Sequence, residues 1–488
     1  MNLTNLYTSL QQTIPEMTVA FFGMLVFTLD FALPRMEKKF LYYIGVLGFL
    51  LAFMFTVLQG NSNTVVYSGG FTIDIFALFF KVLFYMIGIV VLLSSIEYNK
   101  IHEVDRGEYP ALVIFAVLGM LVMASASDFI MFFVGLELSS LSSYVLTGFT
   151  TRKDKKTTEA AVKYFLLGAF SSALMLYGMS LVYGVTGEIA FTKIVQVLAA
   201  GKTNYIMSVA GMMLLVGFSF KIAAVPMHMY VPDVYEGAPT PVSGFISVGP
   251  KAAALAVMLR MFLSVLGTQK VEWTLILAVM AAVSMTLGNF LALREENVKR
   301  LLAYSGIANT GYVLVGFVAA GYSSEVGFTS VMLFFMFYAM AKIGAFSILA
   351  LVCRDKSVGD TLDEIKGLSL VSPWAAAMFA IFVFSLAGIP PTTGFLAKFW
   401  IVSAAMGTNH MTWLAWITVI NAVISAYYYL KLIVAVYFQP VEEGNELSVV
   451  SSASLKVAIT LMAILTIYFG LRPGVFFDMA HHSFKILL

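Results

Sequence analysis

The chain has 488 residues, of which 60% are hydrophobic and 11% are charged, and its formal net charge is +2. Soluble domains carry about 25% charged residues, so this composition excludes an ordinary soluble protein. The nearly balanced charge argues against nucleic acid as a partner. A single cysteine excludes a disulfide framework and any cysteine-ligated iron–sulfur cluster within this chain. The five histidines are scattered and do not suggest a haem or a metal centre.

Apolar stretches recur along the whole chain, and roughly 20 apolar residues are enough to cross the hydrocarbon core. The first residues lack a basic segment, so we expect no cleavable signal peptide, and we expect no soluble domain before or after the helices. The sequence therefore predicts an all-α integral membrane protein. Its fourteen or so transmembrane helices are predicted at 14–33, 40–58, 71–95, 110–126, 128–149, 157–186, 205–232, 243–266, 272–292, 301–320, 325–353, 372–406, 411–437 and 451–470.

The loops between these helices carry basic residues unequally. One set of alternate loops holds fifteen: Arg35, Lys38, Lys39, Lys100, Arg106, Arg152, Lys153, Lys155, Lys156, Arg294, Lys299, Arg300, Arg354, Lys356 and Lys366. The opposite side holds five: Lys193, Lys202, Lys270, Arg472 and Lys485. The positive-inside rule places the richer side in the cytoplasm and both termini outside. An even number of helices also requires both termini on one side.

Two predicted helices contain helix-breaking residues in their middle. The seventh reads FSFKIAAVPMHMYVPD, with Pro226 and Pro232 inside an apolar run. The twelfth reads FSLAGIPPTTGFLAKFW, with Gly388 and the pair Pro390–Pro391 near its centre. As one straight helix, the twelfth would be roughly 52 Å long, well beyond the bilayer core. We therefore expect half-helices around an unwound turn, where freed carbonyls must be covered by protein or water.

The two breaks indicate an internal repeat. Pro226 and Pro391 lie about 165 residues apart, and the string GAFS at 168–171 recurs at 344–347 at a similar offset. Five helices is an odd number, so a second copy of a five-helix unit must be inverted in the membrane, as in many transporters. We therefore predict four segments: helices 1–3 at 1–109, the first repeat (helices 4–8) at 110–270, the inverted second repeat (helices 9–13) at 271–440, and helix 14 at 441–488.

Nine basic residues fall inside predicted helices. Three of them, Arg260, Lys431 and Lys456, lie near helix ends and are expected to reach the membrane interface. The six deep ones are Lys81, Lys163, Lys221, Lys251, Lys342 and Lys398. Each costs roughly 2.5–3.5 kcal/mol to insert on translocon scales. The only acid that the sequence places comparably deep is Glu137, so the lysines are not expected to find acid partners in matching number.

This excess of lysine over acid favours proton transfer over structural ion pairing. A lysine ammonium releases its proton when it is desolvated, whereas a guanidinium stays charged. Neighbouring lysines also lower one another's affinity for protons. We predict a hydrated row of lysines that passes protons between neighbours. Pairing with Glu137 raises the proton affinity of the partner lysine, so separation of the pair releases the proton.

Five positions are the main candidates for this transfer. Glu137 lies mid-helix among serines, and Lys221 lies about one turn before the first break. Lys398 follows the second break, and Lys251 lies about eight residues into the eighth helix. Lys342, mid-helix in MAKIGAF, is favoured as functional.

Four further positions keep two interpretations each. Lys163 follows Glu159 at a favourable i, i+4 spacing near the cytoplasmic end, where it either reaches the interface or takes part in transfer. His228, two residues after the break, is either a neutral hydrogen-bonded histidine or a relay. Tyr304 is a packed aromatic or a proton carrier, and Lys81, outside both repeats, is favoured as a structural or interface residue.

Three segments carry a resemblance to a known family. The first comprises Phe220–Lys221, Pro226–His228 and the stretch VPDVYEGAPTPVSGFISVGPKAAALAV that follows them. The second is LLAYSGIANTGY, and the third is GIPPTTGFLAKF. These segments resemble the proton-pumping antiporter-like family, which includes subunits of respiratory complex I and of multisubunit sodium/proton antiporters. VYEGAPTPV followed by Lys251 most resembles subunit N of the NADH-quinone oxidoreductases. Lys398 also fits subunit N, where subunit M would place a glutamate. The resemblance covers nearly the whole chain.

The resemblance implies fourteen helices, two inverted five-helix repeats, and half-channels around helices 7 and 12. It assigns central roles to positions matching Glu137, Lys221, Lys251 and Lys398. The positions of Lys163, His228 and Tyr304 also match places of interest in the family. Lys342 and Lys81 match no diagnostic position, and the long lateral helix of subunit L is not expected.

The resemblance also implies that this chain holds no cofactor. Electrons would pass from NADH through flavin and iron–sulfur clusters to quinone in partner subunits. The expected partners are other membrane-arm subunits of complex I, with subunits M, K and J as neighbours, the peripheral redox arm indirectly, and the lipid bilayer.

The predicted function is that of a proton-translocating membrane-arm subunit of NADH:quinone oxidoreductase, a translocase of the bacterial inner membrane. Protons would enter from the cytoplasm, load the Lys221–Lys251 row, and leave outside through Lys398. Two alternatives stay open. One is a subunit of a multisubunit sodium/proton antiporter, or of a related ferredoxin-linked complex. The other is a structural or assembly role, in which water and backbone satisfy the lysines.

Overall fold

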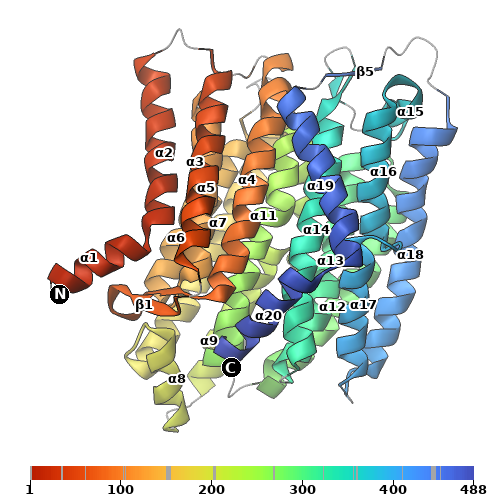
Figure 1. Ribbon diagram of the computed structural model, residues 1–488. Helices are drawn as coiled ribbons and strands as arrows, with labels where there is room; N and C mark the ends of the chain where they lie inside the picture. The colour runs from red at the N-terminus through yellow and green to blue at the C-terminus, as the bar shows by residue number, and fades with distance from the viewer. Residues whose placement is uncertain are drawn as a thin grey trace.

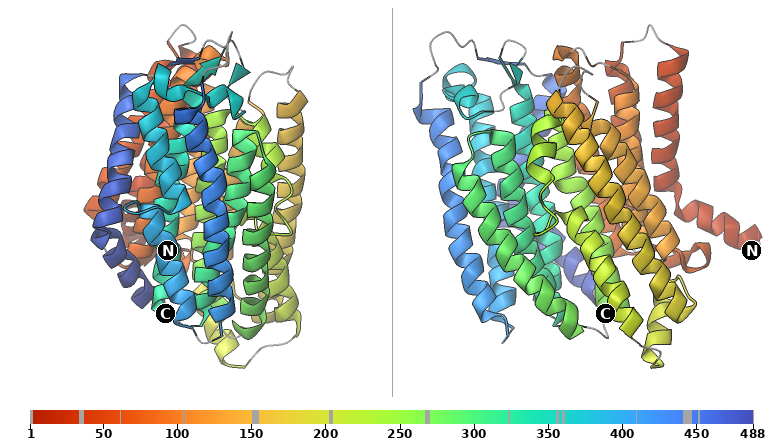
Figure 2. Two further views of the ribbon diagram at one scale, coloured as in Figure 1. Left: turned by 90° about the vertical axis from the view of Figure 1, so that its right-hand side faces the viewer. Right: turned by 180° about the vertical axis from the view of Figure 1, so that it is seen from behind.

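The computed structural model describes residues 3–33, 37–60, 62–102, 104, 106–149, 155–201, 205–266, 270–322, 324–354, 357–358, 361–408, 410–440, 447–450 and 452–487. Within these residues, thirteen helices are long and apolar enough to cross a membrane. The helices stand side by side in one bundle, which is wide in one view and narrow after a quarter turn (Figures 1 and 2).

The helices before the first break and around it follow the predicted order closely. The N-terminal elements are α1 (Leu3–Gln12), α2 (Ile14–Ala32), α3 (Lys39–Gln59), the antiparallel strands β1 (Thr64–Val66) and β2 (Phe71–Ile73), and α4 (Ile75–Ile101). They are followed by α5 (Glu108–Ser125), α6 (Phe129–Thr147), α7 (Lys155–Thr186), α8 (Phe191–Ala199), α9 (Tyr205–Ile222), α10 (Val231–Gly237) and α11 (Thr240–Arg260), which continues into a π-helical turn at Met261–Val265.

The second half contains the other broken run and a small sheet. Its elements are α12 (Lys270–Arg294), α13 (Val298–Gly321), α14 (Glu325–Leu351), β3 (Val352–Arg354), β4 (Ser357–Val358), α15 (Leu368–Val371), α16 (Pro373–Ala387), α17 (Thr393–Met406), α18 (Thr412–Phe438), β5 (Ser448–Val449), α19 (Ala453–Leu471) and α20 (Gly474–Leu487). The strands β4, β3 and β5 pair in that order, and both pairings are antiparallel.

The prediction of about fourteen transmembrane helices is confirmed. In addition to the thirteen long helices, there are two shorter apolar helices, α16 and α17, which follow one another along the chain. Both termini lie toward the same end of the bundle (Figure 1). Of the basic residues that predicted the orientation, Arg35, Arg152, Lys153, Lys202 and Lys356 lie outside the described residues.

Several elements had no counterpart in the prediction, because each is too short to cross a bilayer. They are α1, α8, α10, α15, α20 and the five short strands. The helix α8 buries one face, with Phe191, Ile194 and Leu198 pointing into the protein. Burying one face of a helix needs only a few apolar residues. A search for apolar runs long enough to cross a membrane therefore does not detect such a helix.

Side-chain caps explain where several of the long helices begin. Asp74 accepts a 2.7 Å hydrogen bond from the Ala77 amide at the start of α4, and Asp128 does the same for Met131 in α6. Asn297 caps α13 in the same way, through the Arg300 amide. A capping side chain satisfies an amide that the first turn leaves unpaired, which matters where water is scarce.

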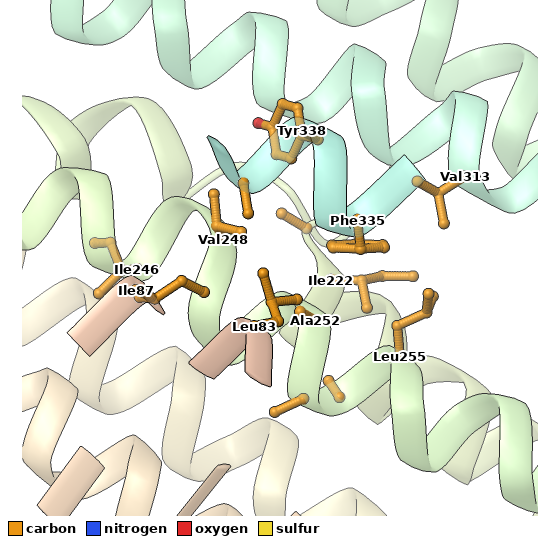
Figure 3. Close-up of a cluster of buried hydrophobic side chains, with 14 of the residues drawn as sticks. Leu83, Ile87, Ile222, Ile246, Val248, Ala252, Leu255, Val313, Phe335 and Tyr338 are labelled. Carbon is orange, nitrogen blue, oxygen red and sulfur yellow. The ribbon is translucent and has the colours of Figure 1, made fainter. Parts of the chain in front are cut away.

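The most buried helices form the centre of the bundle. The apolar windows of α11, α13 and α14 are 94%, 94% and 100% buried, against 28% for α2 and α19. Figure 3 shows how the centre packs: Ala252 and Leu255 of α11 lie near Ile222 at the end of α9 and Phe335 of α14. These helices are apolar on all sides, which is typical of helices enclosed by other helices.

Two buried ion pairs correct the prediction. Arg260, expected at the interface, is buried and forms two bonds of 2.8 and 2.9 Å to Asp74, while its guanidinium lies 4.7 Å from the Phe76 ring. Lys81 pairs with buried Glu16 at 2.6 Å. Asp74 and Glu16 are therefore buried acids that the sequence analysis did not identify as partners of these bases. Both acids lie near the N-terminal ends of their helices, so the sequence alone placed them near the surface.

Candidate functional site

Both interrupted helices end with the same backbone motif. At the end of α9, the amide of Ala224 bonds to the Ser219 carbonyl at 2.8 Å, and Ala223 adopts a left-handed φ of 61°. At the end of α16, the amide of Ile389 bonds to the Phe384 carbonyl at 3.0 Å, and Gly388 has φ 86°. This is a Schellman closure, in which one left-handed residue turns the chain out of the helix.

The freed carbonyls of the first break are capped by neutral hydroxyl groups. Thr310 of α13 donates to the Ile222 carbonyl at 2.8 Å, and Tyr230 donates to the Phe220 carbonyl at 2.9 Å. The Val225 amide also has a partner, the Ser284 hydroxyl of α12 at 3.0 Å. The turn therefore depends on side chains from helices of the second half.

Lys221, the next-to-last residue of α9, points toward α6. Its ammonium donates to the Ser140 hydroxyl at 3.0 Å and to the Tyr144 hydroxyl at 3.3 Å. Glu137, one turn earlier on α6, interacts electrostatically with this ammonium, and one of its buried oxygens has no hydrogen-bond partner among the described residues. The structure thus brings together the predicted acid and base, with hydroxyl groups at the contact.

Lys398, in the second turn of α17, reaches back across the second break. Its ammonium donates to the carbonyls of Leu386 and Ala387 at 3.0 and 2.9 Å, and to the Ser425 hydroxyl at 3.3 Å. The ring of Tyr312 lies 5.2 Å away. The unwound turn therefore frees the carbonyls that bind this buried lysine. Hydrogen bonds to carbonyl dipoles stabilise the charged form of a lysine without an acid partner.

Along the chain, Lys251 of α11 lies after the first break, and Lys342 of α14 lies before the second. Lys342 is fully buried and donates to the Leu302 carbonyl at 2.6 Å and the Ser305 hydroxyl at 2.8 Å. Lys251 is 3% exposed, and its ammonium has no hydrogen-bond partner in the described part of the chain. The two ammonium groups interact electrostatically. Because like charges repel in a medium of low dielectric, protonation of one lysine disfavours protonation of the other.

Tyr338 of α14 is a candidate that the sequence analysis missed. Its buried hydroxyl has no hydrogen-bond partner among the described residues. A side-chain carbon added at Gly306 would lie 3.4 Å from this hydroxyl and 3.7 Å from the Lys251 nitrogen, so both groups face one small space. Tyr338 also lines a cavity of about 10 Å³ with Asn309 and Lys398. Tyr338 therefore borders both the space beside Lys251 and the cavity that Lys398 lines.

A second set of polar side chains surrounds this region. Asn309 donates to the Ser305 carbonyl at 2.7 Å and to the Tyr429 hydroxyl at 3.4 Å. Tyr428 donates to Asn289 at 2.9 Å, and Asn289 donates to Asn421 at 3.0 Å. These groups come from α12, α13 and α18 and are buried. Buried amides and hydroxyls in an apolar sequence are retained where they satisfy one another.

An ion cluster covers the first break at the end of the bundle away from the termini. Asp233 of α10 pairs with Lys163 at 2.6 Å and with Arg300 at 2.9 Å. Glu236, also on α10, pairs with Arg300 at 3.0 Å and with Lys156 at 2.8 Å. Lys163 pairs in addition with its i, i+4 neighbour Glu159, as the spacing predicted. The sequence analysis missed Asp233 and Glu236, although two acids directly after a break were a usable signal.

The remaining candidates lie in less definite surroundings. His228 is buried within the first break, and its Nδ1 has no partner among the described residues. Tyr304 of α13 is partly buried and packs against the apolar core. Lys81 is bound to Glu16. Among the described residues, no group of three histidine, cysteine or acidic side chains is placed to hold a metal ion.

Taken together, the fold and the buried bases define a class: a polytopic membrane protein with two broken helices and lysines buried in its interior. The sequence profile of the family described as NADH:quinone oxidoreductase/Mrp antiporter, TM, matches residues 126–425. The chain belongs to this family.

Individual relatives match nearly end to end. The chain is 38% identical over 481 residues to NADH-quinone oxidoreductase subunit N of Trichlorobacter lovleyi, with 98% of each chain covered. It is 39% identical over 473 residues to the protein of the same name from Desulforamulus reducens, with 97% of this chain and 98% of the relative covered.

Solved structures show the same architecture. A chain of respiratory complex I from Thermus thermophilus superposes with a TM-score of 0.79 at 29% identity, over 95% of this chain and 99% of that one. A chain of the Mrp complex from a Dietzia species superposes with a TM-score of 0.85 at 20% identity, over 98% of both chains. The second likeness shows the fold alone.

Proposed function

We propose that this chain is a proton-translocating membrane-arm subunit of an NADH:quinone oxidoreductase. The observation that carries the proposal is the row formed by Lys221, Lys251, Lys342 and Lys398. Among the described residues, Lys221, Lys342 and Lys398 donate hydrogen bonds to hydroxyls and backbone carbonyls, and Lys251 has no hydrogen-bond partner. Ion pairs that only stabilise a fold use acids in matching number, as at Lys81 and Arg260. A lysine bound to neutral groups is free to exchange its proton with a neighbour.

The proposed path begins at the end of the bundle that carries the ion cluster, which we assign to the cytoplasmic side. Protons reach Lys221, and Glu137 stabilises the charged form of this lysine. Transfer continues through Lys251 to Lys342, whose mutual repulsion allows one of them to be charged at a time. Tyr338 faces the space beside Lys251 and the cavity that Lys398 lines, and it completes the proposed route.

Lys398 is the proposed exit. Its proton leaves toward the outside when the ammonium separates from the Leu386 and Ala387 carbonyls. Moving one charge against about 100 mV requires about 2.3 kcal/mol. No redox group belongs to this chain in the proposal: NADH, flavin, iron–sulfur clusters and quinone are held by partner subunits. The energy therefore arrives from neighbouring subunits as a mechanical or electrostatic change.

The proposed organisation retains the inverted repeats, at 110–270 and 271–440. Each unit has its break in its fourth helix, and each has a lysine in its third helix, Lys163 and Lys342. The string GAFS lies in both third helices. The helix α9 begins at the end of the bundle near the termini, whereas α16 begins at the opposite end (Figure 1). This reversal supports an inverted relationship.

The proposed location is the bacterial inner membrane, with both termini on the periplasmic side. The proposed neighbours are other membrane-arm subunits, with subunits M, K and J adjacent. A sodium/proton antiporter subunit is the alternative function. Copurification separates the two, because NADH- or quinone-linked subunits accompany the chain only under the proposed function. The curated relatives named above, at 38% and 39% identity, favour the quinone oxidoreductase.

The decisive experiment is respiration-driven proton uptake by inverted membrane vesicles that carry Lys221→Ala. Uptake is normalised to quinone reductase activity and to the amount of assembled complex. We expect assembly to survive while coupled proton uptake by this subunit is lost. Lys221→Arg should fail in the same way, because a guanidinium retains its proton. Full proton uptake in both variants would contradict the proposal and favour a structural role for the lysines.

A further inference from the structure

The last two helices of the chain contact both halves of the second broken helix. The indole nitrogen of Trp374, in the first turn of α16, donates to the Thr460 hydroxyl of α19 at 3.1 Å. At the other end, the ring of Trp400 in α17 lies 5.6 Å from the ring of Phe477 in α20. Figure 1 shows α19 descending toward the second broken helix and α20 turning back from its end toward the other side.

Between these two contacts, α19 touches the unwound turn itself through Gly470. A side-chain carbon at position 470 would overlap the carbonyl oxygen of Pro391, and it would lie 2.7 Å from the carbonyl carbon of Thr392 and 2.9 Å from its Cα. All three atoms belong to the backbone, so no side chain can rotate to make room. Glycine is therefore required for this approach of helix to turn.

The turn that Gly470 touches also determines the surroundings of Lys398. The chain runs from the Leu386 and Ala387 carbonyls, which accept from Lys398, through the turn to Thr392. A side-chain carbon added at Gly388 would lie 3.0 Å from Cδ of Lys398, so the turn packs tightly against this side chain. Ser385 holds the turn from the other side, because its hydroxyl accepts from the Gly394 amide at 3.1 Å.

We infer that Gly470 is a positioning residue for Lys398, and that α19 and α20 act as a splint that holds the second break in shape. Gly470 touches no part of the proton path. It acts on Lys398 through the backbone of Pro391 and Thr392. The inference rests on the proposed function of Lys398, and it assigns a role in proton transfer to a helix outside both proposed repeats.

The test is Gly470→Ala in the intact complex, with Gly474→Ala as a matched control, because no atom lies within 4 Å of a carbon added at position 474. The first readout is hydrogen–deuterium exchange of the amides in 388–394. We expect exchange in Gly470→Ala about tenfold faster than in the wild type, on the scale of local opening caused by overpacking. We expect Gly474→Ala to exchange at the wild-type rate.

The second readout is the number of protons taken up per electron in inverted vesicles. Gly470→Ala should lower this ratio, with quinone reductase activity retained per assembled complex. Phe477→Leu weakens the contact with Trp400 without overlap, so it tests the splint if Gly470→Ala fails to assemble. It should change both readouts in the same direction, by less. Unchanged exchange, or faster exchange with an unchanged proton ratio, would overturn the inference.

Lys398→Met, measured in parallel, separates this inference from the proposed function. If Lys398→Met leaves the proton ratio unchanged, the exit role of Lys398 is lost. The exchange experiment then still decides whether Gly470 holds the turn. If Lys398→Met abolishes the contribution of this subunit but Gly470→Ala changes neither readout, only the positioning role is lost.

Discussion

The two breaks share a backbone motif but satisfy their freed carbonyls differently. At the first break, neutral hydroxyls from Thr310 and Tyr230 cap the carbonyls, and Lys221 turns away toward Glu137 on another helix. At the second break, Lys398 itself caps the carbonyls, and among the described residues its hydrogen-bond partners include no acid side chain. Near the first break the buried lysine lies close to an acid, and at the second it bonds to the carbonyls of the turn itself.

This difference implies different ways to control the two lysines. Separating Glu137 from Lys221 requires a movement between α6 and α9, whereas releasing Lys398 requires a change in the turn between α16 and α17. Hydrogen bonds from a charged donor are worth roughly 1.5–3 kcal/mol each. A small change in the shape of the second turn would therefore alter the charge of Lys398 substantially.

The largest expected effect is that of Lys398→Met. Methionine fills a similar volume but leaves the Leu386 and Ala387 carbonyls without their cation and removes the proton carrier. We expect proton transfer by this subunit to be abolished, measured as protons per electron in inverted vesicles. The control is Lys193→Met, because Lys193 on α8 is exposed and its ion-pair partner is Glu188, away from the second break. A retained full proton ratio would refute the exit assignment.

Glu137→Gln should have the next largest effect. It removes the charge that favours protonated Lys221 and keeps the shape of the side chain. An opposite charge nearby changes a proton affinity by about one to three pKa units, so we expect coupled proton uptake to fall about tenfold or more. Glu37→Gln is the matched control, since Glu37 is exposed and pairs with Lys39, away from the proposed path. Equal effects of the two variants would contradict a special role for Glu137.

Thr310→Val tests the neutral capping of the first break. Valine keeps the shape of threonine but cannot donate, so the Ile222 carbonyl loses its 2.8 Å partner from α13. An unsatisfied buried carbonyl costs about 1–3 kcal/mol, which should lower the temperature at which the detergent-solubilised complex loses this subunit. Thr418→Val is the control, because among the described residues the Thr418 hydroxyl bonds only to the Leu414 carbonyl of its own helix. The idea fails if the two variants are equally stable.

The smallest expected effects come from the left-handed residues that begin the breaks. Ala223 carries a left-handed φ that costs a non-glycine residue roughly 1–2 kcal/mol, so Ala223→Gly should raise stability or leave it unchanged. Gly388→Ala should lower the stability by a similar amount, because the added carbon would lie in tight contact with the Lys398 side chain. Thermal stability of the solubilised complex measures both. A gain from Gly388→Ala would show that the second turn does not need its glycine.

The positions of the helices could be predicted closely from the sequence, because crossing a bilayer depends on a local run of apolar residues. The proline-rich turns were also visible, since Pro226 and the pair Pro390–Pro391 interrupt such runs. The partners of the buried charges could not be predicted. Arg260 and Asp74 are 186 residues apart, and Glu16 and Asp74 lie near helix ends, where hydropathy treats an acid as exposed.

The sequence by itself determined that this is a helical membrane protein with two interrupted helices and an excess of lysine over acid in its interior. It also determined which residues carry the family resemblance. Only the tertiary structure decided which lysines meet an acid, which meet freed carbonyls, and that Gly470 lies against the second turn. Length and hydropathy are properties of single segments, whereas the partner of a buried charge is set by how distant helices pack together.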